Sequence, residues 1–492
     1  MGKIRISKRP WLFGLVFFLW FALAQAWPGL AVSAGADNQL ITEDDPKGFE
    51  DGFEDNDPFE EIDIDALTKE NVQNQDGKFL VGGFIEIESE YAFHKNDEKL
   101  SGLKPLLFIE TEYKINENYK VKASGQAFYD MSYDIEAKDN NKGSNLDDEK
   151  KAFGLKDFYL DGKMGDIFSV RIGRQIIAWG DSDYARITDV VNPRDLTSPG
   201  LTDLEDARLP VAAFRLSAFF NAWSFDFVTV HEHPGSKISG KGSDFDYYTL
   251  LRSPVILIND KHTPDSGIKN TSFAFKATHA FNGGDISFVA ADTFDDKPFL
   301  SYDGPANGIM VFTPEYGRII TYGVSASLAK GSGLFKFETA FTRDKKIMRN
   351  DVLANISSGL DNSLIKTTSS KNQVSSLAGV EYTGFTDLRL SFEAQLIHTL
   401  NHRAFLSVDE NEYLTYFKAT KDLLNETLEL ALFWVFMNPG QGNILRLSGT
   451  LDIFDALSVG AGMVFYDAAD LSSDLHPYKD RDRVFIRVKY SF

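Results

Sequence analysis

The chain has 492 residues, of which 51 are Lys or Arg and 72 are Asp or Glu, so its net charge is −21. Nucleic-acid-binding proteins need a basic face for the phosphates, and this balance excludes nucleic acid as a partner. The absence of Cys excludes disulfide scaffolds, thiolate metal sites and lipid attachment through an N-terminal Cys. Hydrophobic residues make up 43% of the chain and aromatic residues 13%, with 41 Phe, so most of the chain is expected to be ordered.

The N-terminus has the pattern of a secretory signal peptide. Four Lys or Arg residues within the first nine precede an apolar run at residues 11–24, and small-residue cleavage motifs follow at 24–26 and 34–36. The run is shorter than the roughly 20 apolar residues that a membrane-spanning helix needs. We therefore predict a cleaved signal peptide at residues 1–26, or as far as residue 36, and export of the mature protein.

Residues 37–76 form a strongly acidic segment with 15 acidic and two basic residues. The sequence Gly-Phe-Glu-Asp occurs twice in succession, at residues 48–51 and 52–55. Like charges at this density disfavour independent folding, which predicts a disordered periplasmic leader. The alternatives are a docking motif whose Phe residues insert into a periplasmic partner or into the mouth of the barrel, and weak cation binding, although no spacing here matches a calcium loop.

From residue 77 to residue 492 the sequence alternates apolar and polar residues with a period of two. At residues 428–436 every even position is large and apolar, and at residues 388–396 the odd positions are Arg389, Ser391, Glu393 and Gln395. Charges on one face of so many strands do not suit a packed soluble core. They suit strands with lipid on one side and water on the other.

The connections between these segments alternate in length. Tight turns such as 116–118 and 282–284 separate long polar stretches at 132–152, 180–210, 232–269, 296–317 and 344–372. Short periplasmic turns and longer outer loops are typical of outer-membrane barrels. We predict an all-β fold, a transmembrane, antiparallel, up-and-down β-barrel of about 18 strands (16–20) over residues 77–492. One of these strands is placed at residues 166–179, with Trp179 near its outer end.

The chain closes on an amphipathic strand that ends in Tyr490, Ser491 and Phe492. A terminal Phe on such a strand resembles the signal by which barrels are recognised for insertion. We therefore expect two partners for the barrel, the outer-membrane lipid and the insertion machinery.

One region resembles a known family. Residues 171–175 (Arg-Ile-Gly-Arg-Gln), 179–182 (Trp-Gly-Asp-Ser), 189–195 (Asp-Val-Val-Asn-Pro-Arg-Asp) and 205–210 (Glu-Asp-Ala-Arg-Leu-Pro) are similar to the signature of the bacterial outer-membrane family known as domain of unknown function 1302. The resemblance implies an outer-membrane channel or exporter component, often associated with hydrophobic compounds. We predict a porin-like channel for small or hydrophobic solutes that is not an enzyme. The alternatives are an outer-membrane hydrolase and a barrel scaffold that docks a periplasmic partner of an export system.

Residues 180–210 are predicted to fold into the lumen and narrow it, because a barrel of this size is open unless something enters it. The alternative is an ordinary solvated outer loop. The loop is rich in acids, and basic side chains on inward wall positions would face it and create a transverse field. The predicted constriction comprises Asp181, Asp183, Arg186, Asp189, Arg194, Asp195, Glu205, Asp206 and Arg208, and the predicted wall comprises Lys120, Lys122, Arg215, Lys336, Arg389 and Arg446.

The first and last strands are predicted to meet through opposite charges, which would set the register of closure. The first strand supplies Glu86, Glu88 and Glu90, and the last supplies Arg483, Arg487 and Lys489.

Motifs for other chemistry are scarce. His231 and His233 could offer two imidazoles to a metal, but this spacing at the start of a polar loop favours a structural role. No nucleophile elbow, zinc-protease motif or phosphate-binding glycine loop occurs in the sequence. We expect no catalytic, metal or cofactor site.

Overall fold

The computed structural model describes residues 78–94, 98–135, 149–202, 207–251, 253–358, 360–438, 440–468, 473 and 475–492. The predicted signal peptide and acidic leader lie outside the described residues, as do Glu205 and Asp206 of the predicted constriction.

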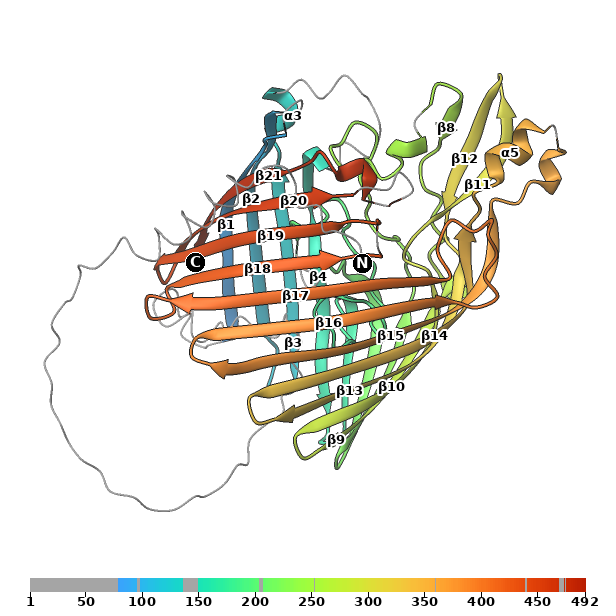
Figure 1. Ribbon diagram of the computed structural model, residues 1–492. Coiled ribbons are helices and arrows are strands. Elements are labelled where there is room, and N and C mark those ends of the chain that lie inside the picture. The colour runs from blue at the N-terminus through green and yellow to red at the C-terminus, as the bar shows by residue number, and fades with distance from the viewer. Residues whose placement is uncertain are drawn as a thin grey trace, which may run out of the picture. The chain divides into compact units, whose positions relative to one another are not determined.

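Eighteen antiparallel strands close into one barrel (Figure 1). Each strand pairs with the next along the wall, and β21 pairs with β1, so the barrel has no open sheet edge. The predicted fold class and strand number are confirmed. The strands are β1 (Phe79–Ala92), β2 (Lys99–Lys114), β3 (Tyr119–Tyr129), β4 (Lys151–Met164), β5 (Phe168–Gln175), β6 (Val211–Phe220), β7 (Trp223–Val230), β9 (Ser272–Phe281), β10 (Gly284–Phe294), β13 (Arg318–Lys330), β14 (Gly333–Met348), β15 (Thr368–Phe385), β16 (Leu388–Thr399), β17 (Asn411–Leu423), β18 (Leu428–Phe436), β19 (Asn443–Phe454), β20 (Leu457–Asp467) and β21 (Arg483–Ser491).

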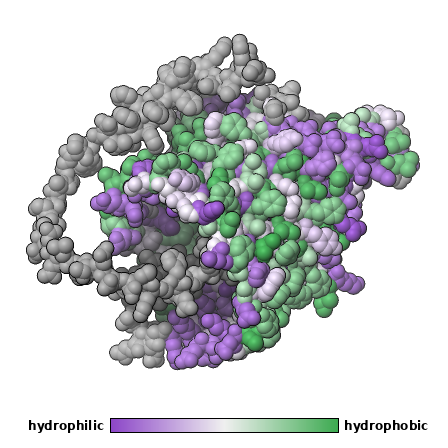
Figure 2. Space-filling model, turned by 60° about the horizontal axis from the view of Figure 1, so that its bottom comes forward, coloured by the Kyte–Doolittle hydropathy of each residue, from purple (hydrophilic) through white to green (hydrophobic). Residues whose placement is uncertain are grey.

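The period-two alternation places apolar side chains outside and polar side chains inside. On β1, Ile85 and Ile87 are exposed, whereas Glu88 and Glu90 on the opposite face are buried. Figure 2 shows hydrophobic side chains over much of the barrel flank. An apolar outer band around a polar interior is the arrangement of outer-membrane barrels. Exposed aromatic rings gather near the short-turn end, where such barrels carry an interfacial girdle: they are Phe79, Tyr113, Phe168, Phe220, Trp223, Phe281, Phe335, Tyr382, Phe385, Phe454, Tyr490 and Phe492.

Glycine permits closure at the C-terminus. Gly83 on β1 and Phe492 exchange two backbone hydrogen bonds of 2.9 Å each. A Cβ atom on residue 83 would lie 2.3 Å from the carbonyl oxygen of Phe108, so a larger residue would force the strands apart.

The outer connections contain more structure than the predicted polar loops. Within the stretches predicted as loops at 232–269 and 296–317, β8 (Ile256–Ile258), β11 (Phe299–Ala306) and β12 (Ile309–Glu315) form a separate three-stranded sheet beyond the barrel rim (Figure 1). Leu300, Phe312 and Val352 form its buried core. Alternation alone did not identify this local core, which joins Leu300 and Phe312 with Val352 from a different outer connection. The short helices are α3 (Ser132–Ile135), α5 (Val352–Ser357), η2 (Thr249–Leu251), η3 (Ile268–Asn270), η4 (Asn362–Leu364) and η5 (His476–Tyr478).

Within the described residues, no helix is long and apolar enough to span a bilayer.

Candidate pore constriction

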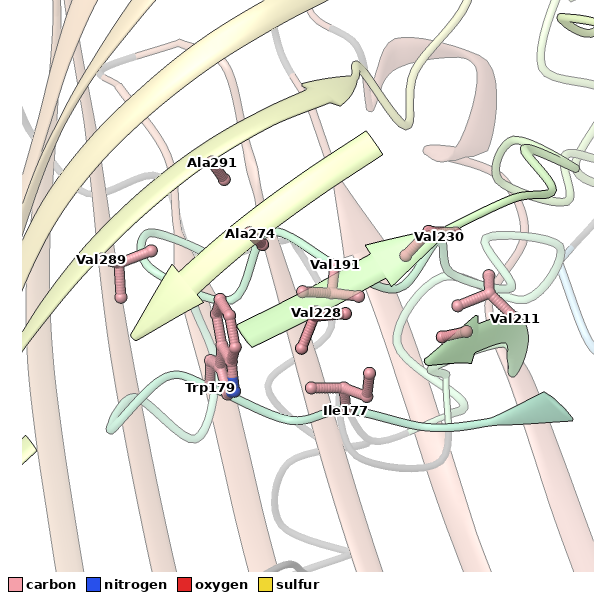
Figure 3. Close-up of a cluster of buried hydrophobic side chains, with 10 residues drawn as sticks. Ile177, Trp179, Val191, Val211, Val228, Val230, Ala274, Val289 and Ala291 are labelled. Atoms are coloured by element: carbon pink, nitrogen blue, oxygen red, sulfur yellow. The ribbon is translucent and has the colours of Figure 1, made fainter. Parts of the chain in front are cut away.

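The described residues between β5 and β6, 176–202 and 207–210, lie inside the barrel, and we call them the inner loop. Ile177, Trp179 and Val191 pack against small or β-branched side chains on the inner faces of four strands (Figure 3). The wall partners in this cluster are Val211 and Ala213 on β6, Val228 and Val230 on β7, Ala274 on β9, and Val289 and Ala291 on β10.

The predicted strand at residues 166–179 was therefore too long. β5 ends at Gln175, and Trp179 is only 2% exposed inside the barrel rather than at its outer rim. The alternation of the strand does not reveal this turn, because the buried cluster that receives Trp179 is assembled from strands that are distant from it in the sequence.

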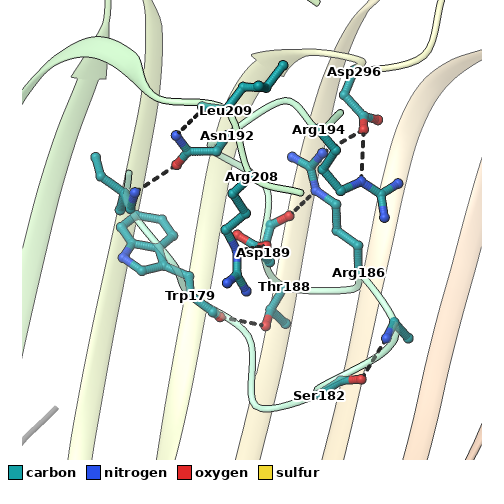
Figure 4. A network of polar contacts seen from close by, with 12 residues as sticks. Trp179, Ser182, Arg186, Thr188, Asp189, Asn192, Arg194, Arg208, Leu209 and Asp296 are labelled. Atoms are coloured by element: carbon teal, nitrogen blue, oxygen red, sulfur yellow. Dashed lines mark hydrogen bonds and ion pairs between the residues drawn. The ribbon is translucent and has the colours of Figure 1, made fainter. Parts of the chain in front are cut away.

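Asn192 ties the two ends of the inner loop together. Its side-chain Oδ1 accepts a hydrogen bond from the Ile177 N–H (2.8 Å), and its Nδ2 donates to the carbonyl oxygen of Leu209 (2.8 Å) (Figure 4). The side chain is fully buried. The Asn-Pro pair therefore has a definite structural role at the point where the loop leaves and re-enters the wall.

Two buried carboxylates of the opposite wall hold the tip of the loop. Glu338 on β14 accepts hydrogen bonds from the backbone N–H groups of Asp181 (2.7 Å), Ser182 (2.7 Å) and Thr188 (3.0 Å), and from the Thr188 hydroxyl (2.8 Å). Glu393 on β16 accepts from the Ser182 hydroxyl (2.5 Å). These two glutamates are 0% and 1% exposed, so their side-chain oxygens take their hydrogen bonds from the loop rather than from water.

The loop continues along the wall beyond this anchor. Tyr184 lies against the rings of Tyr416 on β17 and Phe433 on β18, with centroids 5.8 and 5.2 Å away. Further on, the Tyr466 hydroxyl on β20 donates to the carbonyl oxygen of Pro199 (2.5 Å). The described part of the inner loop thus contacts strands from β6 to β20 and crosses the lumen.

The predicted constriction charges are mostly paired, but rarely with the predicted wall. Asp189 and Arg208 form a buried ion pair within the loop (2.9 Å), and Asp183 binds Lys336 of the wall (2.8 Å). Asp195 lies 3.7 Å from Lys237 of the following loop.

Arg186 and Arg194 both face Asp296, which follows β10, at 2.7 and 3.5 Å. Burial opposes the charge of Asp296, but the two guanidinium groups outweigh it and lower the pKa of this carboxyl. Burial likewise opposes the charge of Arg186, and Asp296 and Asp189 outweigh it and raise the pKa of Arg186.

The predicted basic wall facing the loop needs correction. Of the six wall residues, Lys336 meets a loop acid, and Arg446 donates to the carbonyl oxygen of Leu201 (3.2 Å). The other four face acids on adjacent strands, because diagonal neighbours on one face of a sheet lie closer than the loop does. These pairs are Lys120 with Glu112, Lys122 with Glu110, Arg215 with Asp226 and Arg389 with Glu381.

At the closing seam, β1 and β21 align Glu86 with Lys489 and Glu88 with Arg487. Arg487 contacts Glu88 and lies 3.4 Å from Glu86, and the Lys489 ammonium lies 4.3 Å from the centre of the Phe84 ring. Arg483 binds Glu90 at 2.7 Å, and both side chains are buried.

The two histidines after β7 have protein partners of their own. A ring nitrogen of His231 lies 3.0 Å from the Thr271 hydroxyl, and a ring nitrogen of His233 lies 2.6 Å from the carbonyl oxygen of Asn270. Burial lowers the pKa of His233. Across the described ranges, no three His, Asp or Glu side chains come together in a way that could hold a metal ion.

The sequence reasoning missed the residues that hold the loop most firmly. Glu338, Glu393 and Asp296 were not among the candidate residues. For Glu338 and Glu393, an acid at an inward mid-strand position was the available signal, but many strands of this barrel carry one. Asp296 follows β10 and carried no such signal.

The barrel is similar to solved outer-membrane proteins at low sequence identity. OccAB2 of Acinetobacter baumannii is 11% identical, with 84% of this chain and 98% of that chain covered at a TM-score of 0.50. OccK2 (OpdF) of Pseudomonas aeruginosa, solved with glucuronate, is 9% identical over 84% and 98% at a TM-score of 0.47. The outer membrane channel DcaP of Acinetobacter baumannii is 10% identical over 84% and 97% at 0.41. At this identity the OccAB2 likeness shows the fold alone.

The sequence matches no functionally curated protein. A model of the family described as protein of unknown function (DUF1302) matches residues 89–492, most of the chain and nearly all of the barrel. The chain belongs to the DUF1302 family.

Proposed function

We propose that the protein is an outer-membrane channel for small or hydrophobic solutes and that the inner loop is its constriction. The observation that carries the proposal is the anchoring of residues 181–188 inside the lumen by Glu338 and Glu393. An 18-stranded barrel encloses a wide lumen unless a segment enters it. A segment held by buried carboxylates narrows that lumen at a fixed position along the barrel axis.

The wall supports a water-filled path. Ion pairs such as Lys122 with Glu110 and Arg171 with Asp161 line the inner faces of β2 to β5, while the outer face is apolar. Polar interiors inside an apolar band are found in channels of the bacterial outer membrane, and this supports that location for the protein.

Single-channel recording in planar bilayers tests the proposal. The full-length protein is expected to conduct ions, and deletion of residues 185–203 is expected to raise the conductance severalfold. Deletion of residues 300–313, which belong to the outer sheet, serves as the control and is expected to leave the conductance unchanged. A folded parent protein without conductance overturns the channel, whereas equal conductance of parent and loop deletion overturns the constriction.

The acidic leader is proposed to be dispensable for barrel formation and available to a periplasmic partner. Deletion of residues 37–76 should leave insertion into lipid in vitro intact and should abolish co-purification of that partner. Failure of the truncated chain to insert would contradict this proposal.

A further inference from the structure

The outer part of β4 extends beyond the end of its neighbour β5. The barrel closes around its circumference, but the pairing of β4 with β5 begins only at Phe158 and Arg174. Residues 151–155 pair with β3 on one side, and no described residue forms a backbone hydrogen bond with them on the other side. At about 3.3 Å per residue, this unpaired side of β4 is about 16 Å long.

Both faces of this segment are open. Phe153 on the outer face is 94% exposed, about twice the exposed fraction of Phe288 (45%), which lies on a strand that is paired on both sides. Gly154 lies on the lumen face and is also exposed, and a Cβ atom there would meet nothing within 4 Å. Further along β4, where β5 does pair, Tyr159 is buried. The wall is therefore interrupted beside residues 151–155.

The interruption has the same origin as the proposed constriction. β5 ends at Gln175, whose buried side chain donates to the carbonyl oxygen of Ala213 on β6 (3.1 Å). The chain then enters the lumen, where Ile177 packs in the buried cluster, instead of continuing beside β4. A strand that is diverted into the lumen cannot also complete the wall.

The border of the interruption is apolar on the lipid side. Phe153, Leu155 and Phe158 of β4 and Ile172 of β5 are exposed large hydrophobic residues of the outer face. Unpaired backbone groups are costly in hydrocarbon, but they are tolerated where they line a water-filled cavity. A water-filled opening between the lumen and the lipid meets this requirement for the unpaired side of β4.

We propose that this interruption is a lateral opening through which an uncharged, hydrophobic solute passes between the lumen and the outer leaflet. The proposal rests on the channel function proposed above and adds to it a route and a class of solute. A hydrophobic molecule gains by leaving water for lipid, whereas an ion loses its hydration. Arg174, which borders the opening on β5, is paired with Glu232, so its charge is compensated.

Fluorescence quenching tests whether water and lipid both reach the opening. The sequence contains no Cys, so a bimane label can be placed at one introduced Cys. Gly154→Cys is compared in nanodiscs with Gly460→Cys on the lumen face of β20 and Ala290→Cys on the outer face of β10, both on strands that are paired on each side.

Aqueous iodide is expected to quench the label of Gly460→Cys, and nitroxide-labelled phospholipid is expected to quench that of Ala290→Cys. Both quenchers are expected to act on the label of Gly154→Cys. Quenching of Gly154→Cys by only one of the two overturns the opening.

Hydrogen–deuterium exchange of the unmodified protein in nanodiscs guards against distortion by the label. Peptides that cover residues 151–157 are expected to exchange about tenfold faster than peptides of β10, because part of their backbone is open to water. Equal protection would mean that another chain or another segment pairs with β4 here, and it overturns the opening.

Uptake of N-phenyl-1-naphthylamine by intact bacterial cells tests the route, because an intact outer membrane excludes this uncharged probe. Gly154→Trp narrows the opening and is expected to lower the protein-dependent uptake severalfold, whereas Ala290→Trp is expected to leave it unchanged. Unchanged uptake with Gly154→Trp overturns the route. Single-channel recording separates the two proposals: a conducting parent protein that fails these tests loses only the lateral route, whereas a folded parent without conductance overturns the channel and the route with it.

Discussion

Buried carboxylates accept hydrogen bonds both at the closing seam and at the inner loop. Their donors lie on the adjacent strand at the seam and on a distant segment of the chain at the inner loop. At the seam, Glu88 meets Arg487 on the adjacent strand, in register. In the lumen, Glu338 meets N–H groups of Asp181 and Thr188, which precede it by 157 and 150 positions. Contacts between neighbouring strands follow from alternation, whereas contacts to a loop depend on the path that the loop takes through the lumen.

The two regions also differ in exposure. The Arg487 side chain is 35% exposed, so water can replace part of a lost contact at the seam. Glu338 is 0% exposed, and removal of its carboxylate leaves buried donors without an acceptor. We therefore expect the inner loop to be the more sensitive of the two to a single substitution.

Glu338→Leu should have the largest effect. Each N–H group left without an acceptor costs about 1–3 kcal/mol, and three such groups lose theirs. The loop should detach while the barrel stays closed, so trypsin should cleave after Arg186 and conductance should rise. Glu381→Leu on β15, which removes a pair with the exposed Arg389, should change neither measurement. If trypsin does not cleave the inner loop of Glu338→Leu, contacts other than those of Glu338 hold the loop.

Arg208→Met should loosen the loop next most strongly, because it leaves Asp189 charged and buried. Breaking a buried ion pair costs about 3–5 kcal/mol, but replacing both partners with apolar groups is often nearly neutral. The double variant Arg208→Met/Asp189→Leu should therefore recover much of the resistance of the inner loop to proteolysis. Chymotrypsin cleavage of the loop at increasing urea concentrations measures both variants. Equal sensitivity of the single and double variants would contradict this account of the pair.

At the seam, reversing Arg487 and Lys489 to Glu should have a smaller effect. Opposite charges across strands contribute about 0.2–1 kcal/mol each, and like charges repel by similar amounts. The folded barrel should unfold on gels at a lower temperature, and the further change Glu88→Arg should restore part of the difference. The double variant Lys241→Glu/Lys269→Glu in an outer loop changes the net charge by the same amount and serves as the control. An unchanged unfolding temperature would show that charge pairing does not support closure.

The smallest effect near neutral pH should come from the ion pairs of Asp296 with Arg186 and Arg194. The pKa of Asp296 is lowered in the folded protein. The ionised Asp296 carboxylate therefore stabilises the folded loop fully at any pH above the ordinary aspartate pKa. The contribution is lost only as the pH falls below that value towards the folded pKa. The contribution of Asp296 to conductance should therefore stay constant between neutral and mildly acidic pH and change only in stronger acid, and Asp296→Asn should remove this acid-dependent part. A transition near neutral pH that Asp296→Asn abolishes would contradict the direction of the shift.

The barrel, its strand number and the facing of its residues follow from local patterns in the sequence. Alternation with a period of two is a local property, and turn length separates the two ends of the barrel, so the 18 barrel strands could be placed from residues that are near one another in the chain, whereas β8, β11 and β12 could not. The seam register follows in the same way, because Glu86, Glu88, Arg487 and Lys489 each occupy inward positions of strands that must meet when the barrel closes.

The contacts that hold the inner loop could not be predicted from the sequence, because they depend on the closed barrel. Its insertion was predicted from its position and composition, but the predicted basic wall proved to be paired mainly across neighbouring strands. The decisive acceptors, Glu338 and Glu393, are inward acids like many others until a distant backbone reaches them. A buried carboxylate can be satisfied by any donor that the fold brings within hydrogen-bond distance. The identity of that donor is therefore set by the path of the chain in space and not by the local pattern of residues.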